Sequence, residues 1–436
     1  MIRFGKIIAL LTILATAMVT ADETGSEIAT SQIDGLDPAP TKAQLSLDDL
    51  RTFTDVFNQV RLNFVEESDD QTLLNAAIRG MLSELDPHSS YMEPDEYRKM
   101  ADNSQGRYSG IGVEVIIRDR KINVVFVVTG GAAEKAGVKA GDIITSIGGT
   151  AVRGRNLQSA IDKLRGEPGS EIEVTFQHQN GEVSSHMLTR DFVKIASVFS
   201  RPVDQQYGYF QITHFTLKSA DELLEQIRYM QENLDGPLKG IVLDIRGNPG
   251  GVLTPAVAIA DGFLDDGLIV TTRSRAPNQM EYTAKPGQWL EDIPVVVLVN
   301  AGSASASEVL AGALQDHGRA LIVGQTTFGK GSVQSVLSLR NGGGMRLTTS
   351  RYYTPSGRSI QAIGIRPDIE TPLVKVLDNE GDLRHESDLD RHLDSEADDS
   401  AVVFGSEVSA EQDYAMYQAL ILLKASNVLT GSATQH

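Results

Sequence analysis

The chain has 436 residues, no cysteine and a formal net charge of −19 at pH 7. The absence of cysteine excludes disulfides, a thiol nucleophile, a lipid-modified cysteine and thiolate metal ligands. The acidic balance argues against nucleic acid as a partner, because affinity for phosphate backbones comes mainly from clustered Lys and Arg, and the length is enough for two or three domains.

The N-terminus has the pattern of a cleaved signal peptide over residues 1–21. Arg3 and Lys6 precede an apolar run from Ile7 to Val19, and small residues follow up to Ala21. This run is shorter than the roughly 20 residues that span a bilayer. We therefore expect cleavage after Ala21 and an exported, for instance periplasmic, protein without a stable transmembrane anchor.

After a polar segment (22–44), residues 45–100 have helical patterns. Ser46 and Asp49 resemble a capping box, and apolar residues then recur at helical spacing. A second helical pattern covers residues 73–85 and ends at Asp86-Pro87. We interpret this region as a helical hairpin with a packing role rather than a catalytic one.

Residues 108–192 change to short β-like runs interrupted by one helix that ends at Gly166. They begin with a glycine-flanked loop, Gly110-Ile111-Gly112-Val113, and this order of elements resembles a PDZ domain. In PDZ domains the N–H groups of that loop bind a peptide's terminal carboxylate, while the peptide adds a strand. The loop alone is also compatible with an ordinary β-turn.

From residue 193 to 376 strands and helices alternate, as in an α/β domain. The candidate strands are Gly240–Arg246, Pro294–Asn300 and Ala320–Val323, and the candidate helices are Ala220–Glu232, Thr254–Leu264 and Ala304–Gln315. Residues 377–404 are acid-rich and indicate a linker or surface insertion. The last segment, 405–436, contains an apolar stretch that predicts a helix in need of a partner and is a candidate assembly element.

A cluster of three serines, within Gly302–Glu308, lies between a buried strand and a helix. A serine at such a helix start is close to unpaired N–H groups and to the positive end of the macrodipole, which stabilise developing negative charge. The alternative is that these serines only cap the helix. The segment alone does not indicate which serine reacts.

A serine nucleophile needs a base, and none of the eight histidines lies in a recognisable triad motif. Lys330, between Gly329 and Gly331, is the better candidate. A lysine acts as a base near neutral pH only if burial or nearby cations lower its pKa. The alternative is a solvated loop lysine.

Two further glycine segments bear on the chemistry. Gly324 and Gly329-Lys330 match most of a P-loop, but Gly331 stands where that motif requires Ser or Thr, so we do not expect nucleotide binding. The turn Arg246–Gly251 follows a strand, and its N–H groups are candidates for binding an oxyanion. On its own this segment is more typical of a plain turn.

Taken together, the chain from Leu45 to Pro372 resembles the carboxyl-terminal processing peptidases, or tail-specific proteases. The segments that carry the resemblance are Leu85–Tyr91, the PDZ segment, Asp244–Gly251, Gly302–Glu308, Gly329–Gly331 and Tyr353–Arg358. The resemblance implies an α/β peptidase core of the crotonase and Clp-protease type, with an inserted PDZ domain and an N-terminal helical hairpin.

The resemblance also implies site residues. They are the nucleophile Ser305, its base Lys330, Gln334 to orient that lysine, and the oxyanion donors Ala306 and Gly251, with Gly250 as the alternative to Gly251. The implied reaction is peptide hydrolysis through an acyl-enzyme, without metal or organic cofactor. Implied partners are protein substrates with apolar C-termini, a possible adaptor and further copies of the chain.

Two other functions remain possible on the sequence alone. A non-catalytic periplasmic PDZ scaffold or chaperone could share this fold, although the complete Ser305, Lys330 and Gln334 set argues against it. An acyl-CoA enzyme on a related core is the second alternative, but a PDZ domain has no evident task in such an enzyme.

Overall fold

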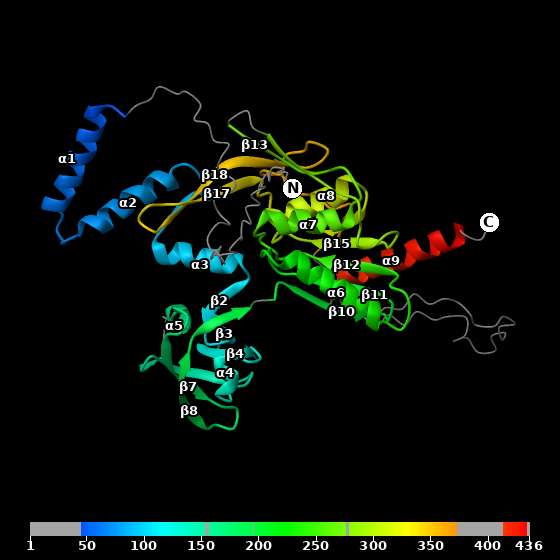
Figure 1. Cartoon of the computed structure of the whole chain (residues 1–436), viewed down its shortest axis with the longest axis horizontal. Coiled ribbons are helices and arrows are strands. Elements are labelled where there is room, and N and C mark those ends of the chain that lie inside the picture. Colours follow the sequence, from blue (N-terminus) through cyan, green and yellow to red (C-terminus); the bar gives the residue numbers. More distant parts are fainter. Residues whose placement is uncertain (1–44, 153–156, 195, 276–278, 373–412, 434–436) are drawn as a thin grey trace, which may run out of the picture. The chain divides into compact units, whose positions relative to one another are not determined.

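The computed structural model describes residues 45–152, 157–194, 196–275, 279–372 and 413–433 (Figure 1). The expected signal peptide (1–21), polar segment (22–44) and acidic segment (377–404) lie outside the described residues. None of the helices within the described ranges is long and apolar enough to cross a membrane.

The N-terminal part is helical, with α1 (Leu47–Asn63), α2 (Asp70–Ser83) and α3 (Pro94–Ser104). The capping box that the sequence predicts at the start of α1 is present: Asp49 N–H donates to Ser46 Oγ, and Ser46 N–H donates to Asp49 Oδ2. Helix α1 has no buried residue. Between α2 and α3 the chain forms the short strand β1 (Ser90–Met92), which belongs to a sheet of the peptidase part.

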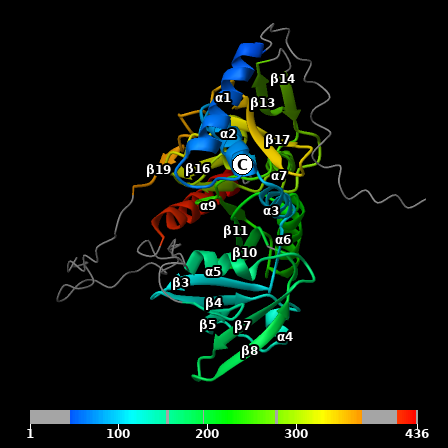
Figure 2. The same ribbon diagram turned by 90° about the vertical axis from the view of Figure 1, so that its left-hand side faces the viewer.

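The PDZ part is a sheet with two helices, and Figures 1 and 2 show these elements together. Its strands pair in the order β3 (Val113–Arg118), β4 (Lys121–Val127), β5 (Ile143–Ile147), β7 (Glu171–Gln177) and β8 (Val183–Thr189), with β6 (Thr150–Ala151) beside β5. The helices are α4 (Ala132–Lys135) and α5 (Leu157–Leu164), and β2 (Arg107–Gly110) pairs with β9 (Asp191–Lys194). Ile122, Val174 and Phe176 are fully buried at its centre.

The peptidase part is built on a six-stranded sheet. Its strands follow the order β10 (Val198–Val203), β11 (Tyr207–Ile212), β12 (Gly240–Asp244), β15 (Val295–Val299), β16 (Ala320–Gly324) and β19 (Ile369–Glu370). All of these pairs are parallel except β10 with β11. Strands β12 and β15 are buried along their whole length. For β15 this agrees with its unbroken apolar sequence, which is typical of a parallel sheet covered on both faces.

Alternate residues of these strands enter two different cores, because successive side chains of a strand point to opposite faces. Ile241 and Leu243 pack with α6 (Ser219–Asn233), α7 (Leu253–Phe263) and α8 (Ala306–Asp316). Val242, between them, packs instead with α9 (Tyr414–Ala433). The C-terminal helix predicted to need a partner therefore finds one in its own chain, and a role in assembly stays a prediction.

A second sheet is antiparallel and contains the strands that follow the loop around Lys330 (residues 327–331), called the lysine loop below. It consists of β1, β18 (Gly344–Tyr353), β13 (Leu268–Ser274) and β14 (Gln279–Thr283), with β17 (Ser332–Ser338) also paired to β18. The α/β core, the inserted domain rich in strands and the N-terminal helices that the sequence predicts are all present.

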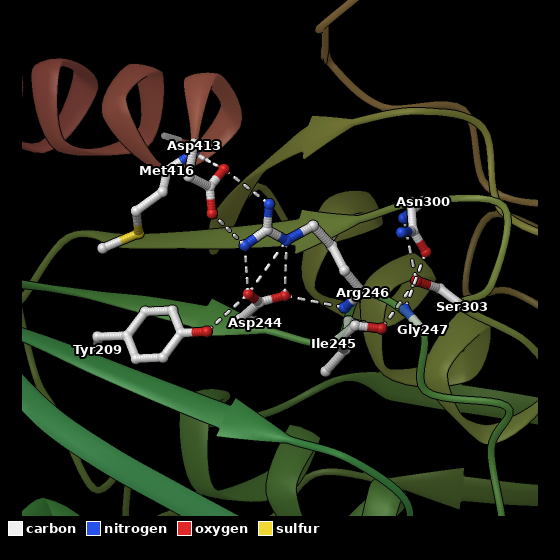
Figure 3. Close-up of polar contacts among 9 residues, drawn as sticks. All are labelled: Tyr209, Asp244, Ile245, Arg246, Gly247, Asn300, Ser303, Asp413 and Met416. Atoms are coloured by element: carbon white, nitrogen blue, oxygen red, sulfur yellow. Dashed lines mark hydrogen bonds and ion pairs between the residues drawn. The ribbon is translucent and has the colours of Figure 1, made fainter. Parts of the chain in front are cut away.

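Helix α9 is fixed to the end of β12 by the ionic network of Figure 3. Arg246 donates to Asp244, with Nη2 2.6 Å from Oδ2, and also to Asp413, at 2.9 and 2.8 Å. Tyr209 donates its hydroxyl to the same Asp244 Oδ2 at 2.8 Å. Because Asp244 is buried, these donors compensate a charge that would otherwise be costly to remove from water.

Asp413→Asn is expected to lower the free energy of unfolding by about 1–2 kcal/mol at pH 7, because Arg246 loses one of its two carboxylate partners. Burial alone would raise the pKa of Asp413, but hydrogen bonds from Arg246 and from Met416 N–H outweigh it and lower that pKa. The stabilisation that ionised Asp413 gives the folded state is therefore complete above its unfolded pKa of about 3.9. It is lost as the pH falls through its lower folded pKa.

Urea unfolding of the wild type and the variant at several pH values measures this difference. The gap should close on acidification, whereas Asp235→Asn, at an exposed aspartate, should change stability by less than about 0.5 kcal/mol at every pH. A gap that stays constant down to acid pH would contradict the ionic origin.

Candidate active site

Ser305 lies at the N-terminus of α8 in a backbone conformation that is rare for a residue with a side chain. Its φ is 56° and its ψ is −112°. Such conformations are strained and persist only where the surrounding structure fixes them, and they are frequent in active sites. Ser305 is also nearly buried, with 9 % of its surface exposed.

The two neighbouring serines have structural partners. Both are fully buried. Ser303 donates its hydroxyl to Ile245 O at 2.8 Å, and Ser307 donates its hydroxyl to Asn248 O at 2.9 Å. These two side chains therefore tie the start of α8 to the loop after β12, a distinction among the three serines that the sequence did not reveal.

Glu308 joins the serine loop (residues 302–308) to the lysine loop. Its fully buried carboxylate accepts hydrogen bonds from Ser305 N–H (2.7 Å) and Lys330 N–H (2.8 Å) on Oε2. On Oε1 it accepts from Thr327 Oγ1 (2.6 Å) and Gly329 N–H (2.7 Å). Four donors around one carboxylate fit its ionised form. In the sequence Glu308 is recognisable only as the end of the segment Gly302–Glu308, so this function was not predicted.

Glu308→Gln is expected to lower the free energy of unfolding by about 3 kcal/mol, because an amide offers one acceptor oxygen and turns its own N–H groups toward other donors. Urea denaturation measures the change. The exposed Glu225 on α6 supplies a matched control: Glu225→Gln should shift stability by less than about 0.5 kcal/mol. Equal stability of the Glu308 variant and the wild type would show that the carboxylate does not hold the two loops together.

The surroundings of Lys330 favour a neutral amine. The side chain is half-buried, and this burial is the main cause that lowers its pKa, followed by the positive charge of Arg346. Asp86 and Glu308 act in the opposite direction but do not cancel the effect. Asp86 belongs to the N-terminal region that the sequence analysis assigned to packing, and it is fixed by N–H donors from His88 and Ser89.

Gln334 lies on β17, four residues beyond the lysine, but its amide nitrogen is directed elsewhere. It donates to Ser332 Oγ at 2.8 Å and to Thr348 Oγ1 at 3.4 Å. Among the described contacts there is no hydrogen bond between Gln334 and Lys330. The orienting contact expected from the resemblance is thus not formed in this structure, although both residues belong to one loop and strand.

Gly250 lies directly against Ser305, whereas Gly251 lies against the backbone of Phe215. A Cβ on Gly250 would be 2.9 Å from Ser305 Cβ and 3.1 Å from Ala306 N, so only glycine fits. Gly250 N–H donates to Asn248 Oδ1 at 2.9 Å. Within the described part of the chain Gly251 N–H has no hydrogen-bond partner, which favours Gly251 over Gly250 as an oxyanion donor.

The predicted peptide-carboxylate loop lies between β2 and β3. Ile111 O accepts from Ala133 N–H at 3.0 Å, and Gly112 O accepts from Val128 N–H at 2.9 Å. Because C=O and N–H point in opposite directions across a trans peptide, the N–H groups of Gly112 and Val113 are directed away from these partners. Gly110 borders a cavity of about 840 Å³ beside α4 and β8.

Among the described residues no cluster of three or more His, Asp or Glu side chains could hold a metal ion. The chemistry available at the site consists of a hydroxyl, a lysine amine with a lowered pKa, and backbone N–H groups. This set corresponds to nucleophilic catalysis with oxyanion stabilisation.

Three family models match the chain: Peptidase family S41 over residues 206–371, PDZ domain over 124–178, and Activating protease CtpB N-terminal domain over 11–96. The carboxy-terminal-processing protease of Bartonella bacilliformis is 44% identical over 349 residues, covering 79% of this chain and 80% of that protein. The carboxy-terminal processing protease CtpA of Bacillus subtilis is 31% identical over 318 residues, covering 73% and 68%.

Among solved structures, the photosystem II D1 C-terminal processing protease is 33% identical, with a TM-score of 0.45, and covers 73% of this chain and 86% of that chain. The sequence identity and coverage of the relatives, together with the matched peptidase and PDZ regions, decide the assignment. The chain belongs to peptidase family S41, among the serine-type carboxy-terminal processing proteases that carry a PDZ domain.

Proposed function

We propose that this chain is an exported endopeptidase that uses Ser305 as its nucleophile and Lys330 as its general base. The observation that carries the proposal is the single Glu308 oxygen that binds both Ser305 N–H and Lys330 N–H. That carboxylate brings the two loops together at the start of α8. A scaffold without catalysis, the runner-up, would have no need for a strained serine beside a half-buried lysine.

In the proposed reaction Lys330 Nζ takes the proton of the Ser305 hydroxyl as Oγ attacks the peptide carbonyl. The negative charge that develops on the carbonyl oxygen is stabilised by the N–H groups of Ala306 and Gly251. The amine leaves with the proton, and water then hydrolyses the acyl-enzyme by the same route. Gln334 supports the lysine loop through Ser332, and no cofactor takes part in these steps.

Export rests on the pattern of residues 1–21, and the periplasm or another exported location is the compartment we propose. We also propose that further copies of the chain assemble with it and that an adaptor protein can deliver substrates. Substrates are expected to be proteins with apolar C-termini, selected by the PDZ loop before cleavage at Ser305.

The tail selection can be tested with a matched pair of peptides that differ only in a free or an amidated C-terminus. The free acid is expected to be cleaved with about five- to 150-fold higher kcat/KM than the amide. Amidation removes the charge that Gly112 and Val113 N–H would bind, and it leaves a buried donor unpaired at a cost of about 1–3 kcal/mol. Steady-state kinetics measures the ratio. Equal cleavage of both peptides would show that the PDZ loop does not bind the terminal carboxylate.

A further inference from the structure

The oxyanion loop after β12 contains two adjacent glycines with positive φ, Gly250 (99°) and Gly251 (142°). Such a segment adopts many conformations when nothing restrains it. An N–H group stabilises a transition state only if its direction is fixed before the reaction. Some other part of the chain must therefore hold this peptide in place.

The peptide between Gly250 and Gly251 is held on one side by its carbonyl. Gly250 O accepts from Phe215 N–H at 2.9 Å. Since C=O and N–H point in opposite directions across a trans peptide, Gly251 N–H is directed away from Phe215. The other restraint acts on Gly250 N–H, which donates to Asn248 Oδ1 at 2.9 Å.

Asn248 is fully buried, and each of its polar groups has a partner. Its Nδ2 donates to Ile212 O at 2.9 Å, while its Oδ1 accepts from Gly250. Its backbone oxygen accepts from Ala304 N–H at 3.0 Å and from the Ser307 hydroxyl at 2.9 Å. One residue thus connects the glycine pair, strand β11 and both sides of Ser305.

We infer that Asn248 is a positioning residue for the oxyanion site, which fixes the glycine pair so that Gly251 N–H is directed at the developing oxyanion. This rests on the function proposed above. The amide is suited to the role because one group must donate to a carbonyl while the other accepts an N–H. Aspartate cannot donate when ionised, and alanine can do neither.

The test is Asn248→Ala in the full chain, measured by peptide cleavage and by binding of a peptide boronic acid, which forms a tetrahedral adduct with a serine hydroxyl. We expect kcat to fall about 100-fold with KM within about threefold, and the boronate Kd to rise about 100-fold. Binding of the uncleaved peptide to Ser305→Ala should be the same with and without the Asn248 change. A purely structural role would lower the Tm without lowering kcat and boronate affinity selectively over KM.

A matched control is Asn427→Ala on α9, which also removes an amide that donates to backbone carbonyls, those of Lys239 and Leu423. It should lower the Tm and leave kcat and boronate affinity unchanged. If Asn248→Ala does not fold, Ser307→Ala replaces it, because it removes only the hydroxyl that holds Asn248 O. We then expect kcat and boronate affinity to fall together by about two- to tenfold.

Two outcomes overturn the inference. If the wild type is active and a folded Asn248→Ala has unchanged kcat and boronate affinity, the inference about Asn248 is refuted but the proposed function is not. The same holds for Ser307→Ala where that variant replaces Asn248→Ala. A wild type that neither cleaves peptides nor binds the boronate would refute the proposed function and the inference with it.

Discussion

Replacing Ser305 by alanine is expected to abolish peptide hydrolysis while the protein stays folded. The loss should be about 10⁴-fold or more in kcat, because removal of a nucleophile leaves only substrate binding and the oxyanion site. The fold should persist, since Ser305 is held through its backbone N–H by Glu308 and alanine keeps that N–H. Cleavage assays and thermal melts of the purified variant measure both effects.

Ser303→Ala and Ser307→Ala are the matched controls, and the structure predicts how they differ from Ser305→Ala. Each removes a hydroxyl that binds a backbone carbonyl of the loop after β12, so each should cost stability and part of the activity. Full turnover by Ser305→Ala with a normal melt, or complete inactivity of a folded Ser303→Ala, would refute the assignment of the nucleophile.

The parts of the fold that could be predicted from the sequence are those set by neighbouring residues. The unbroken apolar run of β15 predicts a buried strand, and the helices α6, α7 and α8 begin and end within two residues of their expected bounds. The Ser46 capping box is local in the same way. Residues far apart in the chain are not needed to recognise any of these features.

The contacts of the candidate site depend on residues far apart in the sequence. Glu308 receives three of its four donors from residues 327–330, and Ser303 and Ser307 donate to carbonyls of residues 245–248. No spacing rule predicts which loops will meet, since that follows from the order of the parallel strands. For the same reason the packing of α9 on β12 and the position of Asp86 near Lys330 could not be predicted.

Lys330→Arg is expected to lower kcat by about 10⁴-fold, nearly as much as Lys330→Ala, although the positive charge is kept. An arginine stays protonated across the working pH range and cannot accept the serine proton. The wild type needs a neutral amine, so its activity should rise as the pH increases through the lowered pKa of Lys330. Kinetics of cleavage over a range of pH measures both predictions.

Changing the charged groups around Lys330 tests in which direction its pKa, and with it the pH profile of activity, moves. Arg346→Gln removes a like charge, so the pKa of Lys330 should rise and the activity profile should move to higher pH; Asp86→Asn removes an opposite charge and should move the profile to lower pH. Burial and then the charge of Lys330 lower the pKa of His88 below its usual value of about 6.5, so a rise in activity at higher pH does not come from this histidine. An active Lys330→Arg would show that Lys330 supplies charge rather than basicity. Profiles that move in the same direction in the two charge variants would show that the rise is not the titration of Lys330.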